Sequence, residues 1–371
     1  MNILLLTEFF PETEAAEITG GVEGRCYYVA RHLRRRHDVK VIATPTDGTQ
    51  WDHASFVSIP RRLTFLARAF IQGMRFDFDL VEGSNFVVHP MAWLLGTLRR
   101  KPVVLYYPDV LLGQWIKRCG PVGALGALVE RAILKLPVAR YITTSPTVVE
   151  RMVAAGVDHE KISLIPCGFE DSLVTSVRRE ADQAFDDQPL YDIVVVNRLV
   201  GYKRVDVVVR AVAQLARTVP AIRALVVGRG PELDALNRLA SELDVRKNIE
   251  FTGHVREHAD VLRLVARSRI FVSASEVEGF GIALVEAMAL GLPYVVSDIP
   301  VVREVTGGGT GGFLFAPGDQ NELAAKLGAL LDDEELQRRK GDEGLSFSGR
   351  YTWRKVSTRT EQVYEGLLQE V

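Results

Sequence analysis

Two glutamates, Glu278 and Glu286, stand eight residues apart in a segment whose pattern can bring both to one ligand. Residues 271–297 read FVSASEVEGFGIALVEAMALGLPYVVS, which predicts a buried strand, a loop, a helix and a second buried strand. Glu278 is expected in the loop and Glu286 in the first turns of the helix, outside the carboxyl end of the strand, where open α/β sheets bind ligands. Carboxylates accept hydrogen bonds from vicinal hydroxyl groups, so the pair suits a ribose and a hexose.

Two glycines shape the same loop. Gly279 and Gly281 relax the backbone just before the helix expected over 282–290. The first N–H groups of a helix have no internal partner and the helix dipole favours an anion there, so a diphosphate fits this end. The simpler interpretation is a strand–loop–helix unit with two solvated glutamates, and the glycine pattern disfavours it.

Two cations, Arg198 and Lys203, follow directly after another expected strand, over 193–196. A guanidinium and an ammonium can neutralise a diphosphate from two sides and stabilise a leaving group as its charge develops. The alternative is ordinary surface charge, which their position ahead of the glutamate pair disfavours.

Apolar strands alternate with helical segments along the chain, which predicts parallel sheets joined by right-handed crossovers. The expected strands are 3–6, 39–43, 80–82, 103–107, 141–144, 162–165, 193–196, 225–227, 249–252, 270–274, 294–297 and 312–315. The expected helices are 22–36, 63–74, 91–98, 122–136, 147–155, 282–290, 321–331 and 353–368. A polar, acidic stretch over 178–188 is interpreted as the linker between two α/β domains.

The bulk composition fits a globular protein of two domains and disfavours some classes of binding partner. Of 371 residues, 47% are hydrophobic and 25% are charged. A net charge of −2 lacks the basic face that a general nucleic-acid binder needs, so we expect no nucleic-acid partner. Three cysteines without metal-ligand spacing indicate free thiols in a reducing cytoplasm. No apolar run approaches the ~20 residues of a membrane span.

These motifs resemble those of the family 4 glycosyltransferases, a large retaining group with the GT-B fold. The two glutamates resemble the family's E-x7-E motif, and four further segments match its pattern in the expected order. The segments are VNRLVGYK over 196–203 with Asn197 in the usual glycine place, LVVGRGP over 225–231, IEFTGHV over 249–255, and ISLIPCGFE over 162–170 with Cys167 for asparagine. Gly20-Gly21-Val22 resembles the glycine loop after the first strand.

The resemblance implies two Rossmann-like domains facing across a cleft. Residues 1–185 are then the acceptor-side domain, 186–350 the nucleotide-sugar domain, and 351–371 a helix that packs back on the first domain. It also implies that a sugar moves from a nucleotide-diphosphate sugar to a hydroxyl acceptor on a glycan, a lipid-linked molecule or a small molecule. Retaining members are thought to use front-side attack, in which the departing phosphate oxygen accepts the proton of the acceptor.

The same resemblance assigns the donor site residue by residue. Glu278 is then expected to contact the transferred sugar, and Glu286 is expected to contact the ribose. Arg198 and Lys203 are expected to bind the diphosphate. The role of the adjacent Arg204 is less defined by the resemblance. The base lies near His254 and Val255. The expected donor-binding set is Gly21, Arg198, Lys203, His254, Val255, Glu278, Gly279, Phe280, Gly281, Ile282 and Glu286.

The acceptor side departs from the family pattern. Tyr107, followed by Asp109, stands where many members carry a histidine at the end of a strand. Tyrosine donates a hydrogen bond but is a poor base near neutral pH, so Asp109 is a second candidate for the polar role. Glu82, at the end of an earlier strand, is expected to point toward the cleft as well. A packed aromatic is the competing interpretation of Tyr107.

No metal or other cofactor is expected, because no Asp-x-Asp element follows a strand at the cleft; Asp332-Asp333 reads as a solvated helix end. Two alternative functions stay open, a nucleotide-sugar epimerase of similar architecture and a non-catalytic subunit that binds sugar nucleotides. A nicotinamide enzyme is disfavoured, because Leu233 stands where the third glycine of a dinucleotide fingerprint belongs.

Arginines punctuate an apolar helix around 61–75 and end the first helix. Basic amphipathic helices lie on anionic lipid, so peripheral membrane association of a cytoplasmic enzyme is one interpretation, and ordinary surface arginines are the other. The sequence leaves the donor sugar, the acceptor and the oligomeric state open.

Overall fold

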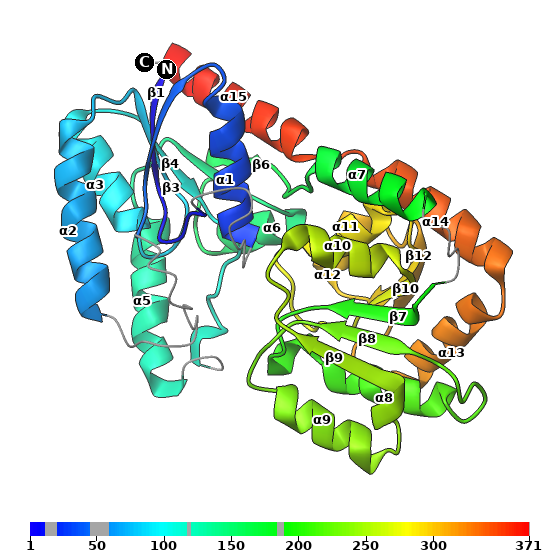
Figure 1. Cartoon of the computed structure of the whole chain (residues 1–371). Coiled ribbons are helices and arrows are strands. Elements are labelled where there is room, and N and C mark those ends of the chain that lie inside the picture. Colours follow the sequence, from blue (N-terminus) through cyan, green and yellow to red (C-terminus); the bar gives the residue numbers. More distant parts are fainter. Residues whose placement is uncertain (12–20, 45–58, 117–119, 184–188, 371) are drawn as a thin grey trace. The chain divides into compact units, whose positions relative to one another are not determined.

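The computed structural model describes residues 1–11, 21–44, 59–116, 120–183 and 189–370 (Figure 1). Its contacts divide the chain into two compact units. Unit 1 comprises Met1–Cys167 and Trp353–Val371, and unit 2 comprises Gly168–Thr352. Gly20, Cys119 and residues 184–188 of the expected linker lie outside the described residues.

Unit 1 is built on a parallel sheet with the order β2-β1-β3-β4-β5-β6. Its strands are β1 (Asn2–Leu6), β2 (Asp38–Ile42), β3 (Leu80–Gly83), β4 (Val103–Tyr106), β5 (Arg140–Thr143) and β6 (Ile162–Leu164). Its helices are α1 (Gly21–Leu33), α2 (Ile59–Arg75), α3 (His89–Arg99), α5 (Gly123–Leu134), α6 (Pro146–Ala154) and α15 (Trp353–Gln369). Helices α2, α3 and α5 cover one face of the sheet, and α1 lies on the other (Figure 1).

Unit 2 is built on a second parallel sheet with the order β12-β11-β10-β7-β8-β9. Its strands are β7 (Tyr191–Val196), β8 (Ala224–Val227), β9 (Ile249–Gly253), β10 (Ser268–Ser273), β11 (Tyr294–Ser297) and β12 (Gly312–Phe315). Its helices are α7 (Asp171–Asp182), α8 (Val205–Leu215), α9 (Leu233–Glu242), α10 (His258–Ala266), α11 (Ile282–Ala289), α12 (Pro300–Thr306), α13 (Gln320–Leu331) and α14 (Glu334–Ser348). The strand order reverses between β7 and β10, and such a point is where α/β sheets bind ligands.

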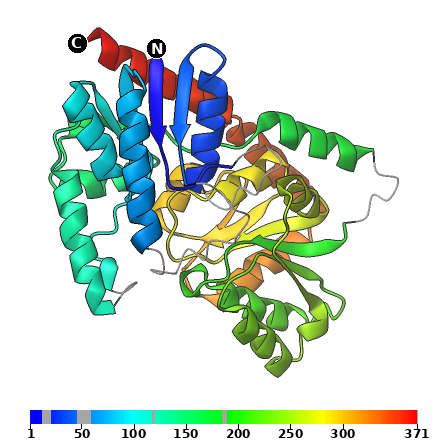
Figure 2. The same ribbon diagram turned by 60° about the vertical axis from the view of Figure 1, so that its left-hand side comes forward.

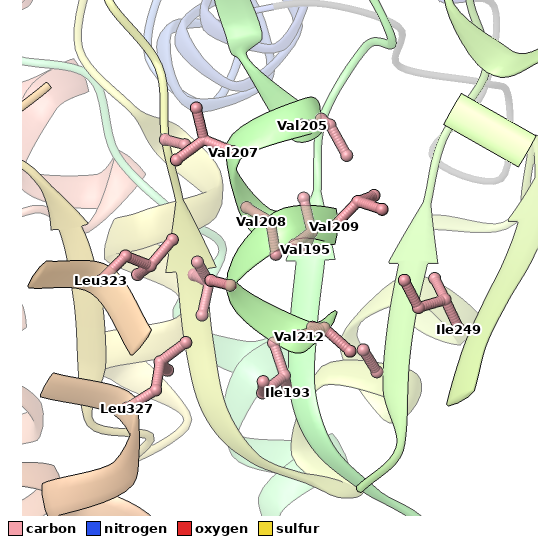
Figure 3. Packing of buried hydrophobic residues seen from close by; sticks show 14 of the residues in the cluster. Ile193, Val195, Val205, Val207, Val208, Val209, Val212, Ile249, Leu323 and Leu327 are labelled. Carbon is pink, nitrogen blue, oxygen red and sulfur yellow. The ribbon is translucent and has the colours of Figure 1, made fainter. Parts of the chain in front are cut away.

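The core of unit 2 explains why a valine-rich segment forms a helix. Helix α8 reads VDVVVRAVAQL, and β-branched residues are only moderate helix formers. Its valines are buried in one apolar cluster that also contains Ile193 and Val195 of β7 and Leu323 and Leu327 of α13 (Figure 3). Burial of this apolar stripe therefore outweighs the weak intrinsic propensity.

The expected α/β architecture is confirmed, and every strand expected from the sequence is present within one or two residues of its predicted bounds. The start of α6 follows its predicted signal, because the Ser145 hydroxyl accepts a hydrogen bond from the N–H of Val148 at 3.4 Å and Pro146 fills the first turn.

The last helix returns to unit 1, as the resemblance implied. Helix α15 packs against α1, and both views place the two helices side by side (Figures 1 and 2). Tyr28 of α1 stacks on Trp353 of α15 with ring centroids 5.3 Å apart.

The division between the units comes earlier than the predicted boundary at 185/186, since the first unit ends at Cys167. Part of the expected linker, 178–188, forms the end of α7, and α7 packs against α10 within unit 2. The reason is a short apolar stripe: Val174 and Val177 are buried, although most of the helix is polar.

Candidate functional site

The loops after β7 and β10 bring a lysine and a glutamate together. These strands are neighbours in the sheet, so residues that follow them meet at its carboxyl edge. The Lys203 ammonium donates to Oε1 of Glu278 at 2.5 Å, and both side chains are largely buried. The loops are joined a second time by the N–H of Glu276, which donates to the carbonyl of Tyr202 at 2.9 Å.

Helix α11 begins directly after this pair with no side-chain cap. Gly281 is its N-cap residue, with φ +92° and ψ +55° in the left-handed region. A Cβ at Gly281 would have space, so the backbone conformation is what requires glycine here. The N–H groups of Leu284 and Val285 bond to the carbonyl of Gly281, and the earlier ones remain at the helix end that favours anions.

Glu286, on the first turns of α11, is held by a histidine outside the predicted set of site residues. Glu286 is buried, and its Oε1 lies 2.8 Å from Nε2 of His258. The Glu286 carboxylate raises the pKa of His258. His258 is the first residue of α10 and follows His254 by four positions, and the only sequence signal for it was this proximity to the expected base-binding loop.

Arg198 and Arg204 differ in how they are engaged. Arg198 is exposed, and its guanidinium donates to the hydroxyl of Tyr202 at 2.8 Å. Arg204 pairs with Asp206 at 3.0 Å and with Glu276, and these hydrogen bonds raise its guanidinium pKa. Arg204 therefore serves the local structure, whereas Arg198 presents its charge at the surface.

The expected base-binding residues follow β9 at the same edge of the sheet. His254 is exposed and Val255 half-buried in the connection from β9 to α10. The N–H of Gly228, after β8, donates to the carbonyl of Gly253 at 2.9 Å and ties this connection to the neighbouring strand. The contact between His258 and Glu286 then links the β9–α10 connection to α11.

Thus the donor-side residues predicted in unit 2 gather at one edge of one sheet. Arg198 and Lys203 follow β7, His254 and Val255 follow β9, and the residues from Glu278 to Glu286 follow β10. Phe280 is buried and packs edge-on against Tyr351 with ring centroids 5.4 Å apart, so its side chain belongs to the core of unit 2.

The two acceptor-side candidates in unit 1 are engaged inside that unit. Tyr107 is buried and its hydroxyl donates to Oε1 of Glu130 at 3.1 Å. Burial, and then the negative charge of Glu130, raise the pKa of Tyr107 well above its usual value. Asp109 pairs with Arg151 at 2.8 Å. Tyr107 therefore does not have the properties of a base near neutral pH, and Asp109 is engaged by a cation.

Glu130 organises the loop after β4 and belongs to no recognised sequence motif. The carboxylate is buried on α5 and accepts from the hydroxyl of Tyr107, the N–H of Leu111 at 2.9 Å and the indole N–H of Trp115 at 2.7 Å. Its three donors are neutral groups spread over nine residues of one loop. Glu130 therefore fixes the path of that loop.

Glu82 was expected to point toward the cleft, and this prediction is wrong. Its side chain is fully buried in unit 1, where Arg25 binds both carboxylate oxygens and Tyr364 of α15 donates to Oε2. Arg25 also lies over the ring of Tyr106, 4.1 Å from its centroid. A buried carboxylate requires such partners, and here they join α1, β3 and α15.

Gly21, the remaining predicted residue, opens α1. Among the described residues, one group has metal-ligand spacing, His37 with Glu361 and Glu365, and it lies between the turn after α1 and helix α15. Arg36 already donates to Glu361 there at 3.2 Å. Asp333 caps α14 by accepting from the N–H of Leu336 at 2.8 Å, in agreement with its interpretation as a helix end.

Two surface hollows in the described structure lie away from the predicted residues. One of about 270 Å³ is lined by side chains around Tyr191 and Phe251 at the amino ends of the unit 2 strands, and one of about 390 Å³ lies between β6 and α15. The first hollow also contains charged side chains, so neither charge nor concavity alone selects a site. The candidate site is the carboxyl-edge cluster, by which we mean Arg198, Lys203, His254, Val255 and residues 278–286, because the carboxyl edge is where open α/β sheets bind ligands.

Comparison with known proteins matches both halves of the chain to family models. The sequence matches the family model for Glycosyltransferase Family 4 over residues 19–173 and the model for Glycosyl transferases group 1 over residues 178–346. N-acetyl-alpha-D-glucosaminyl L-malate synthase from Bacillus anthracis is 33% identical over 169 residues, which cover 45% of this chain and 43% of that relative. The chain thus aligns with less than half of the length of that synthase.

Two further similarities extend over the whole chain. A GDP-mannose-dependent alpha-(1-6)-phosphatidylinositol monomannoside mannosyltransferase from Mycolicibacterium smegmatis is 30% identical over 412 residues, 98% of each chain. The crystal structure of Anabaena Alr3699/HepE in complex with UDP and glucose has a TM-score of 0.77 and 20% identity, and covers 99% of both chains. At that identity, the structural likeness establishes the fold.

Proposed function

Because the chain belongs to the family 4 glycosyltransferases and has the GT-B fold, we propose that it is a retaining glycosyltransferase. It moves a sugar from a nucleotide-diphosphate sugar to a hydroxyl group of an acceptor. The mannosyltransferase relative supports this proposal over nearly the full chain, and the HepE structure supports a nucleotide-sugar donor by analogy of fold.

The observation that carries the proposal is the pair of Lys203 and Glu278 beside the uncapped start of α11. The two charges satisfy one another within unit 2. When a donor binds, the Lys203 ammonium contacts phosphate oxygens and the Glu278 carboxylate accepts from sugar hydroxyls, so both groups keep a polar partner. Exposed Arg198 neutralises the diphosphate from a second side.

The remaining donor contacts follow from the same edge of the sheet. The N–H groups of Phe280, Gly281 and Ile282 bind sugar and phosphate oxygens at the start of α11. Glu286 accepts from the ribose hydroxyls, with His258 fixing the orientation of its carboxylate. Backbone groups at His254 and Val255 contact the base.

The transfer step is front-side substitution. The bond between the anomeric carbon and the departing phosphate oxygen breaks, and the acceptor oxygen bonds to the same face of that carbon. The acceptor proton moves to the departing phosphate oxygen. Support comes from unit 1, where Tyr107 has a raised pKa and so is not a ready base, and where the Asp109 carboxylate is held by Arg151. The mechanism then depends on charge stabilisation by Arg198 and Lys203.

We propose that these two cations neutralise the diphosphate without a metal ion. Activity should therefore persist in a chelator, whereas an enzyme that needs magnesium would lose it. The acceptor is a hydroxyl-bearing glycan, small molecule or lipid-linked sugar, and the mannosyltransferase relative, whose name includes phosphatidylinositol, favours the lipid-linked class.

The decisive experiment is a panel of UDP- and GDP-sugars, scored by thermal shift and by release of the nucleoside diphosphate, with and without EDTA. The true donor binds the native state and should raise the melting temperature most. The anomeric configuration of the product tests retention, and conversion of the donor to an epimer would indicate the epimerase instead. No thermal response to any member of the panel would overturn the proposal.

A further inference from the structure

Large exposed hydrophobic side chains are concentrated in unit 1. Among the described residues there are eleven, and Val219 is the one that belongs to unit 2. Seven of the ten in unit 1 lie on α2, on α5 or in the segment that leads into α5. They are Leu63, Ile71, Ile116, Val122, Leu125, Leu128 and Val129. Scattered exposed hydrophobics are ordinary, whereas a concentration on two helices marks an interaction surface.

The exposed side of α2 carries an apolar stripe and, next to it, a basic stripe. Leu63, 61% exposed, and Ile71, 51% exposed, are eight residues apart with exposed Ala67 midway, which places the three on one side of the helix. Exposed Arg68 and Arg75 lie next to this stripe at helical spacing. The sequence of α2, IPRRLTFLARAFIQGMR, contains no acidic residue.

Helix α5 repeats the pattern. Leu125 and Leu128 are each 62% exposed, and Val122 and Val129 extend the same face. Its exposed charges are basic: Arg131 on the helix and Lys135, which directly follows it. Glu130, the acidic residue of α5, is buried against the loop after β4 and does not reach this face.

Both helices belong to the layer that covers one face of the unit 1 sheet, and both begin beyond the carboxyl ends of its strands (Figure 1). The exposed faces of α2 and α5 therefore form one side of the unit, with α3 between them in the same layer. We use the name apolar-basic face for Leu63, Ile71, Leu125 and Leu128 together with Arg68, Arg75, Arg131 and Lys135.

We propose that the apolar-basic face binds the surface of an anionic lipid bilayer. Leucine and isoleucine side chains insert among acyl chains at the boundary while arginine and lysine contact anionic headgroups. Charge complementarity selects this occupant, because the face has cations and apolar groups and no exposed acid on either helix. The contact is peripheral: within the described residues, no helix is long and apolar enough to cross a bilayer.

Binding to a bilayer would bring the proposed transferase close to a lipid-linked acceptor. Only this consequence rests on the proposed function. Membrane binding itself is independent of donor chemistry, since the face shares no residue with the carboxyl-edge cluster of unit 2. A negative result in one assay therefore leaves the other interpretable.

The test is flotation of the purified full chain with vesicles of phosphatidylcholine alone or with about one-third phosphatidylglycerol. The wild type should float with the anionic vesicles and lose that association as salt rises, because screening weakens headgroup attraction. Leu125→Ser/Leu128→Ser and Leu63→Ser/Ile71→Ser should each lower the partition coefficient about tenfold or more. Arg68→Gln/Arg75→Gln should lower it on the order of tenfold.

The matched control is Val153→Ser/Val219→Ser, which removes exposed hydrophobics of α6 and of unit 2 and should leave flotation unchanged. Circular dichroism and donor hydrolysis without vesicles should be unaltered in every variant. Equal binding to neutral vesicles, or no flotation, overturns the proposal. Sedimentation that shows self-association of the wild type, lost in the leucine variants, also overturns it and assigns the face to a second copy.

Discussion

The polar residues predicted for chemistry are held differently in the two units. In unit 2, Lys203 and Glu278 pair with each other, and Arg198 is exposed at the carboxyl edge. In unit 1, Tyr107 and Glu82 are buried and bonded to groups that shape the fold. In the proposed function, a bound donor would replace the contact between Lys203 and Glu278 in unit 2. The buried polar groups of unit 1 instead hold the framework of that unit together.

The largest expected effect comes from breaking the pair of Lys203 and Glu278 in unit 2. Lys203→Ala and Glu278→Ala should each lower kcat by about a thousandfold or more, because in the proposed mechanism each removes a charge that acts on the reacting sugar or its leaving group. The measurement is nucleoside diphosphate release with the donor found in the panel. Glu276→Ala, two residues away and paired with Arg204, is the matched control and should stay within about threefold. Full turnover in Lys203→Ala or Glu278→Ala would refute the assigned roles.

The next largest effect should be a loss of unfolding free energy when the buried pair of Arg25 and Glu82 in unit 1 is broken. Arg25→Met leaves the buried Glu82 carboxylate without its cation, which should cost about 3–5 kcal/mol of unfolding free energy. Denaturant unfolding measures the loss. The double variant Arg25→Met/Glu82→Leu should recover much of it, since no buried charge is left unpaired. Failure of the double variant to recover would show that packing, and not charge, sets the cost.

A smaller loss of stability should follow Glu130→Gln. The amide keeps one oxygen acceptor, but its N–H group faces a site with three donors, so we expect about 1–3 kcal/mol of destabilisation. Because Trp115 loses a partner, its fluorescence should change before global unfolding begins. Glu150→Gln, on the neighbouring α6, has no such cluster of donors and serves as the comparison.

Tyr107→Phe distinguishes a chemical role from packing. The ring still stacks on His89, whose ring centroid lies 5.0 Å away, and only the hydrogen bond to Glu130 is lost. If the hydroxyl only supports the loop, kcat should stay within about threefold of wild type, a change of under 1 kcal/mol in the barrier. A loss of a hundredfold would instead place the hydroxyl at the reacting groups.

The smallest effect concerns pH and His258. Glu286 raises the pKa of His258 in the folded protein. The ion pair therefore makes its full contribution to the stability of the folded protein below the unfolded pKa of about 6.5. That contribution is lost as pH rises through the folded pKa. The pair is partly exposed, so its size should be roughly 0–1 kcal/mol. The melting-temperature gap between wild type and His258→Gln should narrow from pH 5 to about pH 9; a constant gap would contradict the assignment.

The sequence predicted unit 2 better than unit 1 for physical reasons. The donor residues lie in short loops after buried strands, so strand periodicity and loop length fix where Lys203 and Glu278 meet. The partners of Glu82 are Arg25 and Tyr364, far away along the chain, and local patterns do not encode such a contact. A charge at a strand end was therefore assigned to the site when it belonged to the core.

Other misses have a similar origin. Helix α7 was interpreted as linker because only two of its apolar residues are buried, and a pattern that sparse is below what periodicity detects. Glu130 had no motif, since its three donors are gathered by one irregular loop. His258 was passed over because its partner, Glu286, comes from another helix.

The return of α15 has a consequence for synthesis and folding. Unit 1 is interrupted by all of Gly168–Thr352, so during translation its last helix emerges only after unit 2 is complete. Until then Glu82 and Arg25 are without Tyr364, and Tyr28 is without Trp353. Unit 2 is contiguous and is free to fold first, while the earlier-made unit waits for its final 19 residues.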